Sequence, residues 1–426
     1  MNPICVVGLG FGDEGKGAYV DYLCRTRKVP LVIRYNGGCQ AGHNVITADG
    51  KHHTFSQFGS GTLVPGVGTY LSQFMVIDPL SMRNEEAHLQ ELGVTDAYKR
   101  LYIDKNAPIT TTLHKMLNRT RENSRKVGRH GSCGMGIGEV KSDLLFGRTV
   151  FYAGDLQHPA VMKDKLNEIS EVKRNQMLEF DSGPYSYWQW TAADILKRDL
   201  AVYTEMGKTL NIVDESWFKE KLCTGYRHDD TFVFEGAQGV LLDEKYGFHP
   251  YCSWSDTTVA NAVKLLGPYA DSADYIGIIR GYLTRHGPGP FPTESWGMAT
   301  MLKDAHNTTN EWQGRFRVGH LDMLLLDYAL RAAGKINRLV VTHLDRIESL
   351  IGTAKICLSY EEADIPLPLV GRAITDAMMR AEPVAWATFD ISATTFREHY
   401  LSFISRMTGI KAEEFVPPWI PNKGGA

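Results

Sequence analysis

Short apolar runs alternate with amphipathic stretches along the chain. Ile4–Gly8 is an apolar run that ends in glycine, residues 17–26 carry apolar side chains at helical spacing, and residues 29–35 form a second apolar run. Later segments repeat the pattern, with apolar runs at 232–234, 275–279 and 339–341 and helical spacing at 321–333. Strands that alternate with helices predict an α/β fold with a largely parallel central sheet and helices on both faces.

The middle of the chain has a different character. Residues 119–217 are more polar and have helical spacing, so we expect a peripheral, mostly helical subdomain within a single domain that spans residues 1–426. The tail at 416–426, VPPWIPNKGGA, is rich in proline and cannot be helical throughout.

Composition and charge leave the predicted fold unchanged but exclude several classes of function. The 426 residues are 43% hydrophobic, enough for a sizeable core, and the net charge of -3 gives no reason to expect nucleic acid or an anionic membrane as a partner. The seven cysteines form no C-x-x-C pair, and no run approaches ~18 apolar residues. Because no signal peptide is recognised either, we expect a cytoplasmic protein that neither binds nucleic acid nor crosses a membrane.

Residues 8–17, GLGFGDEGKG, satisfy two phosphate-loop patterns at once. Gly10, Gly12 and Gly15 spell G-x-G-x-x-G, the dinucleotide fingerprint. Gly10, Gly15 and Lys16 spell G-x-x-x-x-G-K, a Walker A loop. The same stretch therefore predicts a phosphate site but leaves open which phosphate it holds.

Neither pattern is complete. A dinucleotide fold needs an acidic residue roughly 20 positions further on, where this chain has Arg34 and Asn36. A Walker A loop needs a hydroxyl after the lysine to bind magnesium, and Gly17 has none. Either the loop is a tight turn without a ligand, or the metal ligand comes from elsewhere, with the Asp13 carboxylate as candidate. A second glycine-rich loop, at 34–46, places His43 just after a predicted strand, which is a good position for chemistry.

These two loops resemble adenylosuccinate synthetase, the family that joins aspartate to C6 of IMP using GTP. G-D-E-G-K-G is followed by R-Y-x-G-G-x-x-A-G-H, and six further motifs occur in family order. They are GSCGMGIG at 131–138, FEGAQGVLLD at 234–243, PYCSWSDTT at 250–258, TRHGPGPFPTE at 284–294, GRFRVGHLD at 314–322 and THLD at 342–345. The resemblance covers nearly the whole chain and implies the family's fold, with a P-loop-like phosphate loop, and its carbon–nitrogen ligase activity in purine biosynthesis.

The implied reaction explains why a carboxylate and an imidazole are needed. The purine 6-oxygen leaves poorly unless it is phosphorylated, which requires a base for the N1 proton and a donor for charge on O6. By resemblance, Asp13 is the base and a Mg2+ ligand, the Gly42 carbonyl is a second metal ligand, and His43 stabilises O6. The implied catalytic set is Asp13, Lys16, His43 and Gln238.

The resemblance also implies three substrate subsites and a homodimer. The purine monophosphate set is Asp13, Gln40, Ser132, Cys133, Arg148, Gln238 and Ser253, with Arg148 reaching the 5′-phosphate across the dimer interface. The amino-acid set is Gln313, Arg315 and Arg317, because guanidinium groups suit a carboxylate. The donor-nucleotide set is Gly12, Gly15, Lys16, Gly17, Gly42, His43, Arg317, His343 and Asp345, in which Asp345 pairs with guanine. The implied partners are a purine monophosphate, L-aspartate and a purine nucleoside triphosphate, with Mg2+ as cofactor.

The sequence departs from the family pattern mainly at ligand contacts. Gln40 stands where an asparagine is usual, Cys133 replaces a threonine and His343 replaces a lysine. The loop EWQGRFRVG at 311–319 is one residue shorter than in the family and loses two threonines, and the family's C-terminal S-T-G-P-x-R has no match in the tail. Changes concentrated at ligand contacts indicate altered specificity.

Three hypotheses therefore stay open. The first is a ligase that uses IMP, or its deoxy analogue, with GTP. The second is a (d)GMP-using enzyme like the viral 2-aminoadenylosuccinate synthetases, with ATP, dATP or GTP as donor; Asp13 disfavours it, because that branch tends to have a small residue there. The third is a relative that uses another amine, or a nucleotide-binding module without catalysis. The intact set of Asp13, Lys16 and His43 disfavours a pure binding module.

Overall fold

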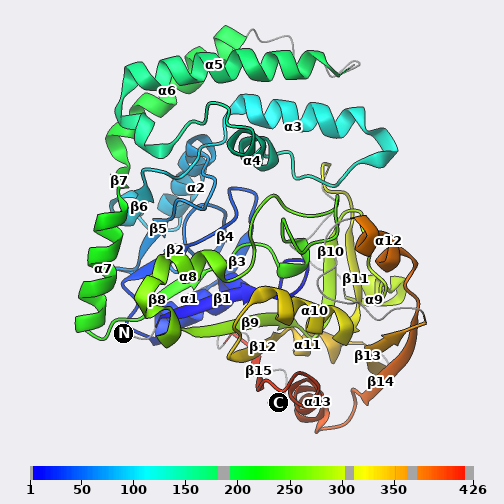
Figure 1. The fold of residues 1–426 in the computed structure, drawn as a ribbon. Helices are drawn as coiled ribbons and strands as arrows, with labels where there is room; N and C mark the ends of the chain where they lie inside the picture. Colours follow the sequence, from blue (N-terminus) through cyan, green and yellow to red (C-terminus); the bar gives the residue numbers. More distant parts are fainter. Residues whose placement is uncertain (1–2, 181–191, 303–310, 351, 362–371, 418–426) are drawn as a thin grey trace.

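The chain folds around a nine-stranded sheet, seen in the computed structural model in Figure 1. The structure describes residues 3–180, 192–302, 311–350, 352–361 and 372–417. The strand order is β15 (Ala412–Phe415), β12 (Arg338–Thr342), β9 (Asp274–Arg280), β1 (Ile4–Gly8), β8 (Phe232–Glu235), β2 (Leu31–Arg34), β5 (Gly68–Leu71), β6 (Leu101–Asp104) and β7 (Asn211–Val213). Every pairing within this sheet is parallel, which confirms the predicted fold class.

Both faces of the sheet are buried, as a parallel sheet requires. Successive residues of β1 alternate between two cores: Ile4 and Val6 pack with helix α1 (Lys16–Thr26). Cys5 and Val7 pack on the opposite face, in the core that contains α10 (Met323–Ala333). The predicted helix at 321–333 is wrong at its first two positions, because Leu321 and Asp322 end a strand instead.

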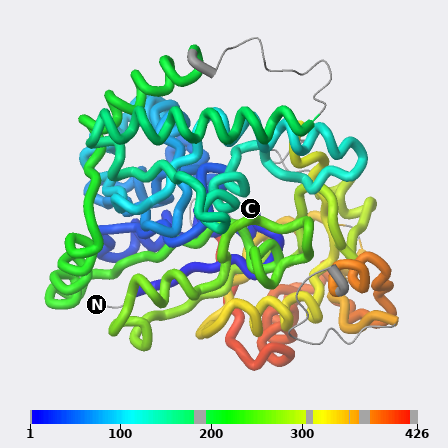
Figure 2. The backbone as a smooth tube through the Cα atoms, turned by 45° about the horizontal axis from the view of Figure 1, so that its top comes forward, coloured from blue at the N-terminus to red at the C-terminus, as the bar shows by residue number. Residues whose placement is uncertain are grey.

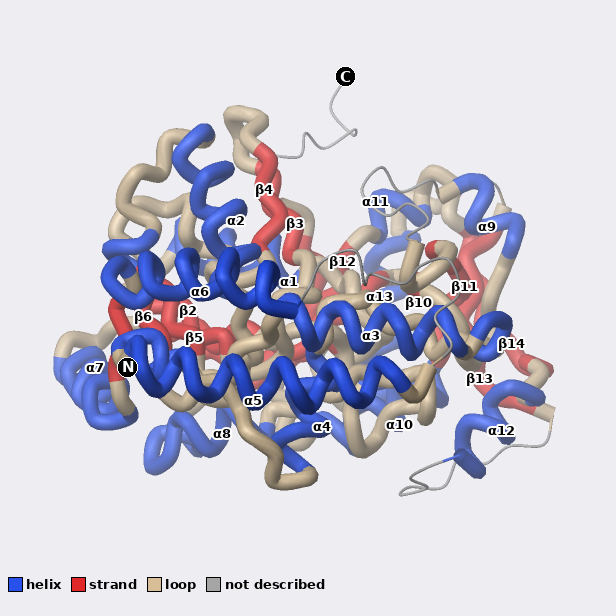
Figure 3. The backbone as a smooth tube through the Cα atoms, turned by 90° about the horizontal axis from the view of Figure 1, so that it is seen from above, coloured by secondary structure: helices blue, strands red, loops and turns tan. Residues whose placement is uncertain are grey.

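A helical layer covers one side of the sheet (Figures 1 and 3). It comprises α2 (Pro79–Glu91), α3 (Thr112–Ser124), α4 (Ile137–Leu145), α5 (Pro159–Leu178) and α6 (Ala192–Thr209). This layer is not confined to the predicted range, because α3 begins at Thr112 and residues 211–213 form the edge strand β7. Helix α7 (Glu215–Arg227) then returns the chain to β8. The boundary of a subdomain at 119–217 stays a prediction.

A second sheet, which the sequence pattern did not predict, lies beside the first. Its order is β10 (Tyr282–His286), β11 (Phe316–Asp322), β13 (Thr353–Tyr360) and β14 (Pro383–Asp390). Helices α9 (Trp296–Met301), α12 (Arg372–Arg380) and α13 (Phe396–Thr408) accompany it. Figure 2 shows these yellow-to-red elements and the teal helical layer on different sides of the central sheet.

The strand order positions the site. Strands β1, β8 and β2 are parallel neighbours, so the segments 9–15, 36–42 and 236–239 all leave the same edge of the sheet. Ligands of open α/β sheets bind at the carboxyl ends of the strands.

Within the described ranges, no helix is both long and apolar enough to span a bilayer. Residues 418–426 of the proline-rich tail lie outside the described residues.

Candidate active site

The phosphate loop between β1 and α1 is tied together by an internal carboxylate. Glu14 Oε1 accepts hydrogen bonds from the amides of Gly10 (3.0 Å) and Gly12 (2.8 Å), and Lys16 Nζ lies 2.5 Å from Glu14 Oε2. Both side chains are 3% exposed. Gly15, at φ 89°, has the left-handed conformation that favours glycine and precedes the first turn of α1. Glu14 thus orients both the loop and its lysine.

The missing Walker hydroxyl has a steric cause. A Cβ atom on Gly17 would lie 2.8 Å from the Cβ of His43 and 3.1 Å from Ser60 Oγ. A serine or threonine there would therefore force apart α1 and strand β3 (His43–Ile46), which pairs with β4 (His52–Phe55). Gly17 therefore allows His43 to pack against the phosphate loop.

Asp13 lies on the same loop at φ 60° and is partly exposed. Its Oδ2 is 3.0 Å from His286 Nε2 at the end of β10, and its backbone carbonyl accepts a hydrogen bond from Arg280 Nε. Burial alone would raise the pKa of Asp13, but the hydrogen bond from His286 and the charges of Arg280 and Lys16 lower it overall. Asp13 is therefore a carboxylate, and thus a proton acceptor, at neutral pH.

His43 is held by a buried glutamate from another strand. Its Nδ1 donates to Glu235 Oε1 (2.6 Å), and Glu235 also accepts hydrogen bonds from the amide (2.9 Å) and hydroxyl of Ser60. Burial would raise the pKa of Glu235, but His43, Arg34 and Ser60 lower it to about 2. Burial lowers the pKa of His43, an effect that Glu235 opposes and the charges of Arg34 and Lys16 reinforce. The neutral ring therefore carries its proton on Nδ1 and presents a bare Nε2.

The segment after β8 joins the two loops. A Cβ on Gly239 would lie 2.2 Å from the Gly10 carbonyl oxygen, and the Ala237 amide donates to Asn36 Oδ1 at 2.7 Å. Gln238, between them, has φ 54°, and its Oε1 would be 3.1 Å from a Cβ on Gly37. The structure thus brings Gln238 to the loop that carries His43.

Buried polar atoms without partners collect around these loops. Gln238 Oε1 and Nε2, Gln40 Oε1 and His43 Nε2 are buried and have no hydrogen-bond partner in the described part of the chain. The Gln40 oxygen would lie 2.8 Å from a Cβ on Gly38, next to the contact of Gln238 with Gly37. Unpaired buried polar atoms are costly, so such a group indicates a place for a polar ligand.

The remaining residues predicted for the purine monophosphate lie on other segments. Ser132 lies in the loop before α4, and its Oγ donates a hydrogen bond to Asn118 Oδ1 on α3 at 2.9 Å. Burial raises the pKa of the neighbouring Cys133 thiol to about 11. Arg148 follows α4; its side chain is 34% exposed and lies 3.5 Å from Asp143. The backbone amide of Ser253 donates a hydrogen bond to the Leu242 carbonyl oxygen at 2.7 Å. Among the described residues, no hydrogen bond or ion pair joins Arg148 to the phosphate loop or the histidine loop.

The two arginines predicted for the amino acid share one internal carboxylate. Arg315 Nη2 lies 2.7 Å from Glu294 Oε1, and Arg317 Nε lies 2.9 Å from Glu294 Oε2. Gln313 lies in the same loop, and a Cβ on Gly287 would be 2.3 Å from its carbonyl oxygen. The predicted pair of guanidinium groups is therefore brought together.

The end of β12 supplies the residues predicted for the donor base. Thr342 Oγ1 donates to the Glu14 carbonyl (2.8 Å), and His343 Nδ1 is 2.7 Å from the same hydroxyl. The His343 ring reaches the phosphate loop, with Cε1 3.4 Å from a Cβ position on Gly15. Asp345 follows in the short helix α11 (Leu344–Ile347) and is partly buried. The donor-base segment and the phosphate loop are therefore adjacent.

The motif comparison missed the side chains that support the predicted ones. His286 and Glu294 both lie within TRHGPGPFPTE, and Glu235 lies within FEGAQGVLLD. The motifs therefore contained a signal for these residues. Their roles depend on contacts between distant segments, since Glu235 and His43 are 192 residues apart.

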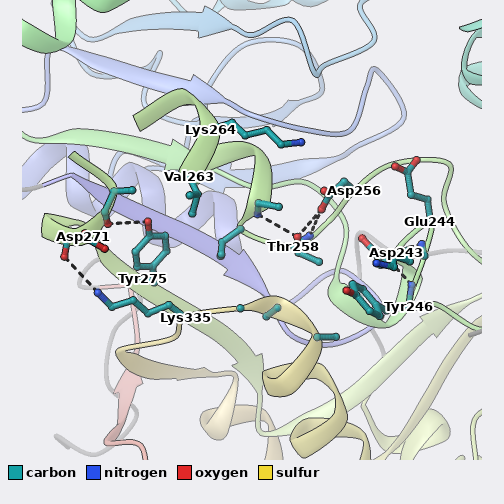
Figure 4. Close-up of a pocket in the computed structure, with 17 residues that line it drawn as sticks. Asp243, Glu244, Tyr246, Asp256, Thr258, Val263, Lys264, Asp271, Tyr275 and Lys335 are labelled. Atoms are coloured by element: carbon teal, nitrogen blue, oxygen red, sulfur yellow. Dashed lines mark hydrogen bonds between the residues drawn. The ribbon is translucent and has the colours of Figure 1, made fainter. Parts of the chain in front are cut away.

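A separate cavity of about 680 Å³ lies beside α8 (Ala260–Leu266). Figure 4 shows Asp271 and Lys335 at one end and Glu244 and Tyr246 at the other, with Asp256 hydrogen-bonded to Thr258 between them. None of the predicted site residues is among the residues that line it. The cavity is therefore not part of the candidate active site.

Comparison with known proteins gives a consistent result. The family model described as adenylosuccinate synthetase matches residues 5–404. The chain is 32% identical to the adenylosuccinate synthetase of Bdellovibrio bacteriovorus over 382 residues, which cover 88% of this chain and 83% of that protein. It is 30% identical to that of Clostridium beijerinckii over 430 residues, covering 96% of each.

Two solved structures share the fold. The fully ligated adenylosuccinate synthetase of Plasmodium falciparum superposes with a TM-score of 0.81 at 22% identity, covering 98% of this chain and 96% of that one. The succinoaminodeoxyadenylate synthetase of cyanophage S-2L, bound to dGMP and dATP, superposes with a TM-score of 0.52 at 17% identity, covering 95% and 99%.

Proposed function

Because the chain belongs to the adenylosuccinate synthetase family and is a carbon–nitrogen ligase, we propose that it joins L-aspartate to C6 of IMP with GTP. The observation that carries this proposal is a group of buried polar atoms on Gln40, His43 and Gln238, next to a phosphate loop, that have no hydrogen-bond partner among the described residues. A nucleotide monophosphate whose base offers both donors and acceptors would satisfy them.

Asp13 is the proposed base for the purine N1 proton. Its lowered pKa keeps it ionised, and His286 already engages Oδ2, which leaves Oδ1 for the proton. Removal of the N1 proton makes O6 the nucleophile that accepts the γ-phosphoryl group of the donor, and the donor leaves as a diphosphate. The aspartate amine then attacks C6 and inorganic phosphate leaves with the O6 oxygen.

His43 is the proposed electrophile at O6. Its Nε2 is the ring atom that Glu235 leaves available. Negative charge on bound phosphates would oppose the effect of burial and favour a proton on Nε2. The ring would then be a cation between Glu235 and the charge that develops on O6, and thus a preorganised hydrogen-bond donor to that charge.

Lys16 and the amides of the phosphate loop are proposed to hold the donor phosphates. The amides of Gly10 and Gly12 are engaged by Glu14, so those of Gly15, Lys16 and Gly17, at the start of α1, are the ones proposed for phosphate. Two oxygen ligands that suit Mg2+ are accessible here, because the Asp13 carboxylate is partly exposed and Gly42, with its backbone carbonyl, is exposed. A bound Mg2+ would neutralise the charge of the phosphates.

The finer partners are proposals of the same kind. Arg148 is half-exposed and its guanidinium lies 4.9 Å from the Phe146 ring, so it is accessible to a 5′-phosphate in a second copy of this chain. Ser132, Cys133 and Ser253 are proposed to bind the same nucleotide, and Arg315 and Arg317 a carboxylate of aspartate. Asp345 is proposed to read the donor guanine beside His343. A cytoplasmic location suits the seven free thiols.

The test is a substrate panel. The purified protein is incubated with IMP, dIMP, GMP or dGMP, together with L-aspartate, Mg2+ and either GTP or ATP. Phosphate release and the ultraviolet shift of the purine are followed in parallel. We expect turnover with IMP and GTP. Turnover with GMP or dGMP alone would contradict the purine assignment, and phosphate release without incorporation of aspartate would contradict the amine.

A further inference from the structure

Glu294 occupies the predicted amino-acid subsite with a carboxylate that belongs to the chain itself. Its Oε1 accepts from Arg315 Nη2 at 2.7 Å, and its Oε2 accepts from Arg317 Nε at 2.9 Å and from Arg317 Nη2. One carboxylate thus satisfies donors on both guanidinium groups. A fork of this kind is how arginine binds a carboxylate ligand.

The two arginines have other supports. Arg317 Nη1 donates to the carbonyl oxygens of Gly287 (3.1 Å) and Gly289 (2.8 Å), and the Arg315 guanidinium lies 4.1 Å from the Trp296 ring centroid. These contacts support each guanidinium in addition to Glu294. Glu294 is therefore not the sole support of either arginine, and it adds an acceptor and a negative charge.

The charge balance of this region requires an anion. Arg285 is buried nearby, with its guanidinium hydrogen-bonded to the carbonyl oxygens of Pro288, Pro290 and Tyr251. Burial, together with the charge of Arg317, lowers the pKa of Arg285 to about 9. Exchange of Glu294 for the carboxylate of a ligand would preserve the balance, whereas loss of Glu294 alone would not.

The Arg315 contact is placed for such an exchange. The Arg315 side chain is 43% exposed and Glu294 is 19% exposed, whereas Arg317 is 12% exposed. An ion pair open to water is weak and breaks readily, because solvent screens it. A ligand carboxylate would therefore reach Arg315 first.

We propose that Glu294 is the resident occupant of the amino-acid carboxylate subsite, and that a four-carbon dicarboxylate displaces it from Arg315 on binding. The identity of the amino acid rests on the proposed function. Glu294 thereby sets the affinity of the subsite, because each ligand carboxylate must compete with a carboxylate that is already in place.

The test measures binding of succinate, a dicarboxylate without an amine, by isothermal titration calorimetry. The variants are Glu294→Gln, which keeps the shape of the side chain but removes its charge, and Glu348→Gln as a matched control. Glu348 makes a comparable two-pronged pair with Arg397, at 2.6 Å for each contact, on elements other than those that carry the predicted amino-acid subsite. Thermal unfolding of each variant is recorded alongside to establish that it is folded.

We expect Glu294→Gln to bind succinate about tenfold more tightly than the wild type, since a charge-assisted hydrogen bond no longer competes. Glu348→Gln should bind it as the wild type does. Equal or weaker binding by Glu294→Gln, or no binding by either protein, would overturn the proposal. A wild-type structure with succinate is a second test, which the proposal fails if Glu294 keeps its contact with Arg315.

The same variants separate this inference from the proposed function. In the ligase assay, the KM for L-aspartate should fall in Glu294→Gln and stay unchanged in Glu348→Gln. If the wild type turns over aspartate but Glu294→Gln shows no fall in KM, the inference fails and the function stands. If the wild type does not use aspartate, the function fails, and succinate binding still decides the inference.

Discussion

Substitution of Glu235 by glutamine tests the proposed role of His43 at its support. Glu235 is fully buried and accepts hydrogen bonds from His43 Nδ1 and from both the amide and the hydroxyl of Ser60. A neutral amide cannot stabilise a cationic imidazole in this position, and its NH2 group can donate to Nδ1 and reverse the tautomer. We expect kcat to fall by about 10²–10⁴-fold, the usual worth of a positioned acid or base, while substrate KM values change little.

The structure also sets the cost in stability. The pKa of Glu235 is lowered from 4.5 to about 2, so its charged form is favoured in the folded state and contributes to stability at neutral pH. A carboxylate with a depressed folded pKa contributes this stability above its unfolded pKa and loses it as pH falls through the folded value. In denaturant unfolding at pH 7, the wild type should therefore be more stable than Glu235→Gln. This difference in stability should disappear as pH falls from about 4.5 to about 2.

Glu85→Gln is the matched control. Glu85 is also buried, accepts hydrogen bonds from the amides of Ser56, Gln57 and Phe58, and has a histidine, His53, 3.7 Å away. It lies outside the predicted site, so its loss should lower stability and leave kcat within about twofold of the wild type. If Glu235→Gln retains more than about a fifth of wild-type kcat, or if Glu85→Gln loses as much activity, His43 is not the group that acts on O6.

Three further outcomes follow from the structure. Asp13→Asn should abolish phosphate release yet bind IMP in equilibrium dialysis, because an amide cannot take the N1 proton; near-normal turnover would remove Asp13 as the base. Burial raises the pKa of Asp322 to about 6, so the folded protein favours the protonated carboxyl group and becomes less stable as pH rises from 3.8 through 6. Above pH 6, Asp322→Asn should therefore unfold at a higher denaturant concentration than the wild type. Below pH 4, the variant should show no such advantage. Arg148→Ala and His43→Asn should each be inactive alone, but subunits mixed after denaturation and refolding should regain activity, unless Arg148 acts within its own chain.

Much of the fold could be read from local pattern. Strand β1 occupies the predicted residues, α1 begins one residue earlier than predicted, and β8, β9 and β12 contain the predicted runs, because each is buried on both faces and therefore reads as a continuous apolar segment. The second sheet has no such signal: β14 alternates between partly buried and exposed positions with little regularity. Its strands are recognisable only when they pair.

The sequence by itself determined the phosphate loop, the histidine loop and the family, because each depends on residues that are adjacent in the chain and whose spacing is fixed by covalent geometry. It could also show that Gly17 lacks a hydroxyl, but only the packing of α1 on β3 explains why none fits.

Only the tertiary structure decided which charge faces which. The pairs of Asp13 with His286, His43 with Glu235, and Arg315 and Arg317 with Glu294 join segments that meet through the strand order of the sheets. Electrostatic and hydrogen-bond energies depend on distance and burial in space, not on separation along the chain, so no spacing rule could reveal them.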